Sequence, residues 1–175
     1  MDREIAMIRD KIRSIEDHPK EGIIFRDITP ALGDSQTMEA MVKSLVELAK
    51  EYSVDKVVGI EARGFIVGAP VAYALGVGFV PIRKPGKLPA ERYVQEYALE
   101  YGTDVIEMHK DAIAPGEKVL IVDDLLATGG TSVAAAKLIH QAGGEIQAFL
   151  FLIELDDLEG RKSIEEYRVA SVLHY

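Results

Sequence analysis

The sequence predicts an α/β domain built on a parallel β-sheet. Short apolar runs rich in β-branched residues recur along the chain and alternate with helical patterns. This alternation is typical of buried parallel strands that are joined by crossover helices. The length of 175 residues fits a single domain, which we expect to span residues 1–175, and no linker or internal repeat interrupts it.

The N-terminal part is predicted to be mostly helical. Four isoleucines recur at spacings of three and four and predict an amphipathic helix that ends at His18-Pro19. These are Ile5, Ile8, Ile12 and Ile15. Residues 22–33 have an irregular pattern with short strand-like pieces. A second helix is expected from about Gln36 to Tyr52, with Asp34 or Ser35 as its N-cap.

The remaining chain supplies the strands of the sheet. They are predicted at residues 56–60, 77–82, 119–122 and 146–153, with 170–174 as a candidate edge strand. Helices are expected at 65–75 and from about 131 to 142, where Gly143-Gly144 ends the second one. Residues 64–82 carry no charge, but glycines and prolines divide them into a helix and a strand, which argues against a membrane span.

One excursion, at about 83–104, is too long and polar for a simple connection in a compact sheet. It begins with three cations within five residues, Arg83, Lys84 and Lys87, and it contains tyrosines at 93, 97 and 101. The tyrosines and the position between two core strands favour a lid over disorder. A solvated basic turn is the simpler interpretation of the cations alone.

The composition and net charge limit the kinds of ligand that the chain is expected to bind. The chain has 20 basic and 29 acidic residues, a net charge of −9, which argues against a nucleic-acid-binding surface. An acidic protein that binds a polyphosphate must concentrate positive charge locally or recruit a metal. Cysteine is absent and the four histidines show no metal-ligand spacing. The charged N-terminus shows no secretory signal, so we expect a cytoplasmic protein without membrane contact.

Residues 119–131 carry the clearest functional signal. An apolar strand runs into Asp123-Asp124, then into a short loop with Gly129-Gly130, then into a helical pattern. Ligands of open α/β sheets lie beyond the carboxyl ends of the strands. Carboxylates there suit sugar hydroxyls, and amides of a glycine-containing turn at a helix start suit a phosphate. An ordinary turn with a helix cap is the alternative, and neither a Walker loop nor a dinucleotide fingerprint is present.

A second loop, Glu61-Ala62-Arg63-Gly64, follows the strand at 56–60. An arginine fork and the amides of a helix start can bind phosphate together. Taken alone, a surface arginine that caps a neighbouring helix is the simpler interpretation. Because this loop shares a sheet edge with the acid pair, the sequence favours an anion site.

These motifs resemble those of a known family. Residues 119–131 are similar to the phosphoribosyl pyrophosphate motif of the phosphoribosyltransferases. Four further segments resemble the adenine branch of the type I purine enzymes, namely PKEGIIFRDITP at 19–30, EARGF at 61–65, RKPGKLP at 83–89 and LEYG at 99–102. The similarity runs from the first predicted helix to about Arg161.

The resemblance implies the parallel-sheet type I phosphoribosyltransferase fold. It implies a flexible lid at about 83–104, a small base-binding hood formed by about 1–33 with part of 154–175, and a cis peptide at about Glu61–Ala62. The implied reaction converts adenine and phosphoribosyl pyrophosphate to AMP and pyrophosphate. The implied cofactor is Mg²⁺ carried by the substrate without direct protein ligands, and the implied assembly is a homodimer.

The resemblance also implies the site residues. Asp123 and Asp124 hold the ribose hydroxyls, and Glu100 is the candidate general acid or base; these three are the catalytic candidates. The ribose 5-phosphate as a whole is assigned to Asp123, Asp124, Ala127, Thr128, Gly129, Gly130 and Thr131, with the 5′-phosphate on the last five. The pyrophosphate falls to Glu61, Ala62, Arg63, Gly64, Lys84 and Lys87. Adenine falls to Ile24, Phe25, Arg26 and Leu155.

Two alternatives stay open at this point. A transferase for a 6-oxo purine often places a lysine near the base, and no lysine replaces Leu155 in this sequence. A regulator that binds the phosphoribosyl ligand without turnover needs an added nucleic-acid surface, against which the acidic balance counts.

Overall fold

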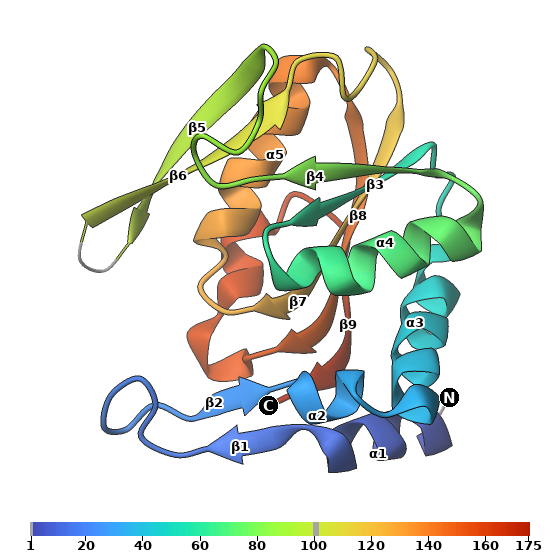
Figure 1. Ribbon diagram of the computed structural model, residues 1–175, viewed down its shortest axis with the longest axis vertical. Helices are drawn as coiled ribbons and strands as arrows, with labels where there is room; N and C mark the ends of the chain where they lie inside the picture. Colours follow the sequence, from blue (N-terminus) through green and yellow to red (C-terminus); the bar gives the residue numbers. More distant parts are fainter. Residues whose placement is uncertain (1, 100–101) are drawn as a thin grey trace. The chain divides into compact units, whose positions relative to one another are not determined.

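The computed structural model describes residues 2–99 and 102–175 and divides into two compact units (Figure 1). One unit ends at Ser44, and the other runs from Leu45 to Tyr175. The boundary between them lies inside helix α3 (Ser35–Ala49).

The first unit combines helices with a small hairpin. Its further elements are α1 (Asp2–Lys11), β1 (Arg13–Ile15), β2 (Phe25–Asp27) and α2 (Thr29–Leu32). The prediction of one helix as far as His18 is wrong beyond Lys11, because β1 pairs antiparallel with β2 and this pairing takes up its backbone hydrogen bonds. The Asp34 cap is confirmed, since Asp34 Oδ1 accepts the backbone N–H of Thr37 at 2.9 Å.

The second unit contains the predicted parallel sheet. The strand order is β4-β3-β7-β8-β9, and every neighbouring pair is parallel. The strands are β3 (Lys56–Ile60), β4 (Gly78–Ile82), β7 (Lys118–Leu126), β8 (Glu145–Glu154) and β9 (Val169–His174). The edge position expected for residues 170–174 is confirmed by β9.

Two helices cover opposite faces of this sheet. Helix α4 (Arg63–Leu75) approaches β3 closely, since a methyl group on Gly59 would lie 2.9 Å from the carbonyl oxygen of Gly64. Helix α5 (Gly130–Ala142) packs on the other face with the apolar side chains of Val58, Ile121 and Phe149. Two 3₁₀ helices, η1 (Asp156–Leu158) and η2 (Gly160–Ile164), connect β8 to β9.

The excursion after β4 is largely an antiparallel hairpin of β5 (Arg92–Leu99) and β6 (Gly102–His109). It lies beside α5 (Figure 1). Tyr93 and Tyr97 pack against the core under α5, while Val94 between them is 51 % exposed. The spacing of the tyrosines is therefore a strand signal that the sequence interpretation did not use.

No helix in the described ranges is long and apolar enough to cross a membrane. The uncharged segment 64–82 divides into α4 and β4, as its glycines and prolines predicted.

Candidate active site

The acid pair lies inside a strand. The expectation that this strand ends at Val122 is wrong, because β7 continues to Leu126 and stays in register with β8, where Asp123 is opposite Phe151. Strand β8 pairs with β7 as far as Leu126, and the apolar run of β7 alone did not reveal this end point. The two carboxylates are therefore held on regular strand backbone near the C-terminal end of β7.

Asp123 and Asp124 are adjacent acids with limited exposure to solvent. Asp124 is buried, and its Oδ2 lies 2.7 Å from Nε of Arg63 at the start of α4. Burial and the neighbouring charge of Asp124 raise the pKa of Asp123 well above its ordinary value. Burial also raises the pKa of Asp124, although Arg63 opposes this shift. The acid pair is therefore suited to bind a cation or to accept hydrogen bonds from hydroxyl groups.

Gly64 leaves room for the Asp123 carboxylate. A methyl group on Gly64 would lie 2.6 Å from Oδ1 of Asp123, closer than atoms can pack. The glycine at this position in the second loop thus has a steric purpose, which is a close approach between α4 and β7.

We expect Gly64→Ala to displace the Asp123 carboxylate and to lower turnover about tenfold or more, because a misplaced catalytic group loses its alignment. Steady-state kinetics with an unfolding curve would check this. Gly78→Ala is the matched control, since its methyl group would keep 3.7 Å from the nearest atom. Equal kinetics in the two variants would contradict the role given to Gly64.

The loop after β7 forms the N-terminus of α5. Gly129 is the N-cap residue with φ of 86°, a left-handed conformation that favours glycine. The backbone N–H groups of a helix's first turn have no partner within the helix and attract anions. The residues predicted to hold the 5′-phosphate, Ala127 to Thr131, are thus placed together at a helix start.

The cations of the expected lid are engaged with carboxylates. Glu61 accepts hydrogen bonds from the backbone N–H of Lys84 at 2.8 Å and from Nε of Arg83 at 3.1 Å. Lys87 Nζ lies 3.8 Å from the same carboxylate. The hydrogen bond from the Lys84 backbone, followed by the two side chains, keeps the pKa of Glu61 below its ordinary value. Glu61 therefore anchors the basic segment.

Lys84 connects this segment to the hairpin. Its Nζ pairs with Asp104 on β6 and lies 3.3 Å from the hydroxyl of Tyr97 on β5. Nothing in the sequence singled out Asp104 as a partner, because the pairing follows from the hairpin register. The peptide bond between Glu61 and Ala62 is cis, as the resemblance implied.

The expected adenine contacts are distributed over both units. Ile24 lies just before β2, and Phe25 and Arg26 lie on it in the first unit, where the Phe25 ring meets His18 edge-on at 5.3 Å. Leu155 belongs to the second unit, and its N–H donates to the carbonyl of Leu126 at 3.0 Å. Glu100, the expected general acid or base, lies outside the described residues.

Comparisons with known proteins identify the family of the chain. The profile of the phosphoribosyl transferase domain matches residues 31–173. The chain is 56 % identical over 168 residues to an adenine phosphoribosyltransferase of Clostridium perfringens, which covers 96 % of this chain and 98 % of the relative. It is 57 % identical to that of Halothermothrix orenii, over 93 % of this chain and 95 % of the relative.

Solved structures give the same result. The adenine phosphoribosyltransferase of Thermoanaerobacter pseudethanolicus superposes with a TM-score of 0.95 at 50 % identity, over 98 % of this chain and 99 % of that one. The Saccharomyces cerevisiae enzyme, solved with adenine, gives 0.93 at 37 % identity over 99 % and 100 %. The chain therefore belongs to the phosphoribosyltransferase family and, within it, to the adenine phosphoribosyltransferases.

Proposed function

We propose that this chain transfers the 5-phosphoribosyl group from phosphoribosyl pyrophosphate to adenine, giving AMP and pyrophosphate. The observation that carries the proposal is the Asp123–Asp124 pair on β7, which runs directly into the anion-binding start of α5. The relatives named above support the choice of adenine, and a Giardia lamblia relative was solved with 9-deazaadenine.

The acid pair acts on the ribose. Displacement at the anomeric carbon develops positive charge of the oxocarbenium type, as in glycoside transfer. Asp123 and Asp124 accept hydrogen bonds from the ribose hydroxyls and stabilise this charge at close range. The loop from Ala127 to Thr131 binds the 5′-phosphate through its backbone amides.

The pyrophosphate is assigned to the loop after β3 and to the basic segment after β4. We assign it to Arg63, Lys84 and Lys87, with the backbone of Glu61, Ala62 and Gly64. Of the rim's four cations, Arg63 pairs with Asp124, Arg83 and Lys87 with Glu61, and Lys84 with Asp104. Four positive charges thus face three carboxylates, so the chain alone neutralises little of a pyrophosphate. This balance fits Mg²⁺ carried on the substrate, and when bound it would stabilise charge on the leaving group.

The base and the lid complete the site. We assign adenine to Ile24, Phe25, Arg26 and Leu155, as part of a hood formed by about 1–33 and part of 154–175. Residues of about 83–104 serve as the lid, which excludes water from an intermediate that would otherwise hydrolyse. A hydrogen-bond pattern at the base distinguishes adenine from a 6-oxo purine, because an unpaired buried polar group is costly.

The protein is proposed to act as a cytoplasmic homodimer. Helix α4 has no charged residue after Arg63, and it presents Tyr73 at 89 % exposure and Ile66 at 42 %. An exposed apolar helix face of this kind suits contact with a second copy.

Release of pyrophosphate from phosphoribosyl pyrophosphate and Mg²⁺ tests the function, with adenine, hypoxanthine, guanine and xanthine supplied separately. Turnover with adenine alone supports the proposal. Turnover with an oxo-purine would overturn the base assignment. Silence with every base, in protein that still binds phosphoribosyl pyrophosphate, would favour a regulator.

We expect Glu100→Ala to lower the turnover number by about a hundredfold, the usual contribution of a positioned general acid or base. Ribose 5-phosphate should bind with unchanged affinity, because Glu100 is assigned to the purine and not to the phosphate. Glu96→Ala, which removes an exposed acid from β5, is the control. Near-normal turnover in Glu100→Ala would remove Glu100 from the mechanism.

A further inference from the structure

The segment that follows Leu155 lies directly against the phosphate loop. A methyl group on Gly160 would lie 2.1 Å from the carbonyl oxygen of Ala127, and one on Gly129 would lie 2.6 Å from the carbonyl oxygen of Gly160. Such distances permit no side chain at either position. The two backbones are therefore interlocked through a pair of glycines, one at the start of η2 and one in the loop.

Ser163 adds a directed contact to this packing. Its hydroxyl donates to the carbonyl oxygen of Thr128 at 2.9 Å, which orients a peptide in the middle of the loop. The N–H group on the far side of that peptide belongs to Gly129, the N-cap of α5. Because the peptide group is planar, a contact that fixes the carbonyl of Thr128 also fixes the direction of the Gly129 N–H.

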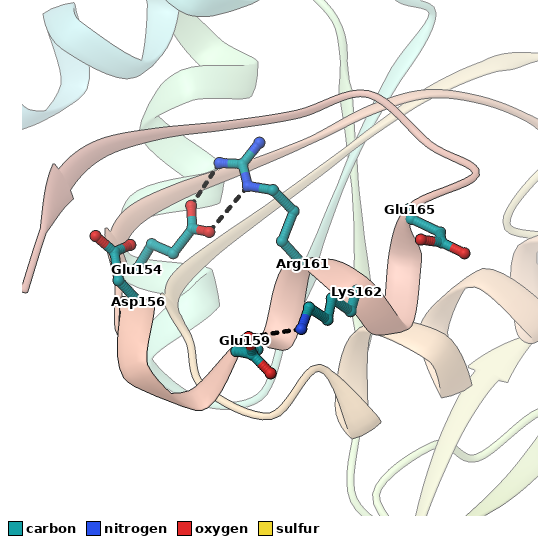
Figure 2. Close-up of a pocket in the computed structure, with 6 residues that line it drawn as sticks. All are labelled: Glu154, Asp156, Glu159, Arg161, Lys162 and Glu165. Carbon is teal, nitrogen blue, oxygen red and sulfur yellow. Dashed lines mark hydrogen bonds and ion pairs between the residues drawn. The ribbon is translucent and has the colours of Figure 1, made fainter.

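An ion pair between half-exposed Arg161 and buried Glu154 holds the start of η2. Arg161 donates to both carboxylate oxygens of Glu154, from Nε at 2.9 Å and from Nη2 at 2.6 Å (Figure 2). Ser171 on β9 donates to the same carboxylate at 2.6 Å, and Arg161 Nη1 donates to the carbonyl of Val169 at 2.7 Å. This network joins η2 to the last residue of β8 and to β9. Helix η2 is thereby connected to the sheet that carries Asp123 and Asp124.

We propose that η2 is a brace for the phosphate loop, in which Gly160 and Ser163 are positioning residues that set the affinity for the 5′-phosphate. This inference rests on the proposed function, because it concerns the same phosphate. The brace begins five residues after Leu155, which is assigned to the base. It therefore also gives the chain a short covalent route between the base contact and the phosphate contact.

Ser163→Ala tests the brace. We expect the dissociation constant of ribose 5-phosphate, measured by calorimetry, to rise about three- to tenfold, the usual effect of one lost hydrogen bond. The dissociation constant of Mg²⁺–pyrophosphate should stay within twofold, since its residues lie on the other loop. The Michaelis constant of phosphoribosyl pyrophosphate should rise while that of adenine does not. Ser163→Thr, which keeps the hydroxyl, should restore the parent values.

The controls separate positioning from stability. Lys162→Ala removes the neighbouring η2 side chain, which is exposed and pairs with Glu159 (Figure 2), and should change neither constant. Equal weakening of both ligands in Ser163→Ala, or no change in either, would overturn the brace. The unaltered protein is assayed first. Absence of AMP formation there would overturn the proposed function, whereas normal turnover with an unaffected Ser163→Ala variant would overturn only the brace.

Discussion

Replacing Asp123 and Asp124 together by asparagine is expected to lower turnover about a thousandfold or more while the fold persists. Both side chains are assigned to the charge that develops on the ribose, and removing one such electrostatic group costs about 10²–10³ in rate. Asparagine has nearly the same volume, so the packing against Gly64 is kept. Single-turnover formation of AMP would measure the loss. Asp111→Asn, at an exposed position, is the control.

Asp123→Asn alone should stabilise the protein at neutral pH. Burial raises the pKa of Asp123 in the folded state, so the folded state binds more protons than the unfolded state above pH 3.8, the ordinary carboxyl value. Stability from this group is therefore complete below that value and is lost as the pH rises through the folded pKa. Asparagine does not titrate, so the variant does not lose this stability as the pH rises.

Urea unfolding of Asp123→Asn between pH 4 and 8, without ligand or Mg²⁺, would measure this effect. The gain over the parent should grow with pH. A gain that is independent of pH, or a loss at pH 8, would contradict the raised pKa. Asp124→Asn should gain less, because it also removes the partner charge of Arg63.

Arg161→Ala is expected to give the largest loss of stability. Removing one partner of a buried ion pair costs about 3–5 kcal/mol when both charges are desolvated. The side chain of Arg161 is 44 % exposed, whereas that of Glu154 is 7 % exposed, so we expect about 2–3 kcal/mol. For a chain of this size that is a fall of roughly 4–12 °C in Tm. Thermal unfolding would measure it.

The pH dependence of the stability loss in Arg161→Ala identifies its cause. Burial acts to raise the pKa of Glu154, but the hydrogen bonds from Arg161 and Ser171 outweigh it and keep the pKa below 4.5. In the parent, this stabilisation is present above the ordinary value and is lost as the pH falls through the folded pKa. Without Arg161, burial prevails and the sign reverses, so the difference between the proteins should widen from pH 4 to pH 7. Adding Glu154→Gln should recover part of the loss at pH 7, and no recovery would assign the loss to packing.

The sequence predicted the architecture better than the local geometry. The apolar runs identified all five strands of the sheet, because strands buried on both faces leave continuous apolar segments. They did not show where β7 ends, since Asp123 and Asp124 stay in the ladder through pairing with β8. The position of Ile15 fits the spacing of a helix, and only the pairing of Arg13–Ile15 with β2 makes this segment a strand.

The candidate site was predicted by residue type but not by partner. Arg63 lies 2.7 Å from Asp124, and the loop at the start of α5 follows the strand that carries the acid pair, although the two aspartates lie within β7 and not after it. The partners of Lys84 and Glu154 depend on the hairpin register and on the return of β9. Neither can be derived from spacing along the chain.

The place of the acid pair on β7 has a consequence for the order in which the protein opens. Strand β7 pairs with β3 as far as Val122 and with β8 as far as Leu126, so we expect its amides to be among the last of the chain to exchange with solvent. The β5–β6 hairpin forms a separate two-stranded sheet. Its opening leaves the hydrogen bonds of β7 intact. The carboxylates of Asp123 and Asp124 thus stay in register with β8 if the hairpin opens, so their geometry does not depend on the position of the hairpin.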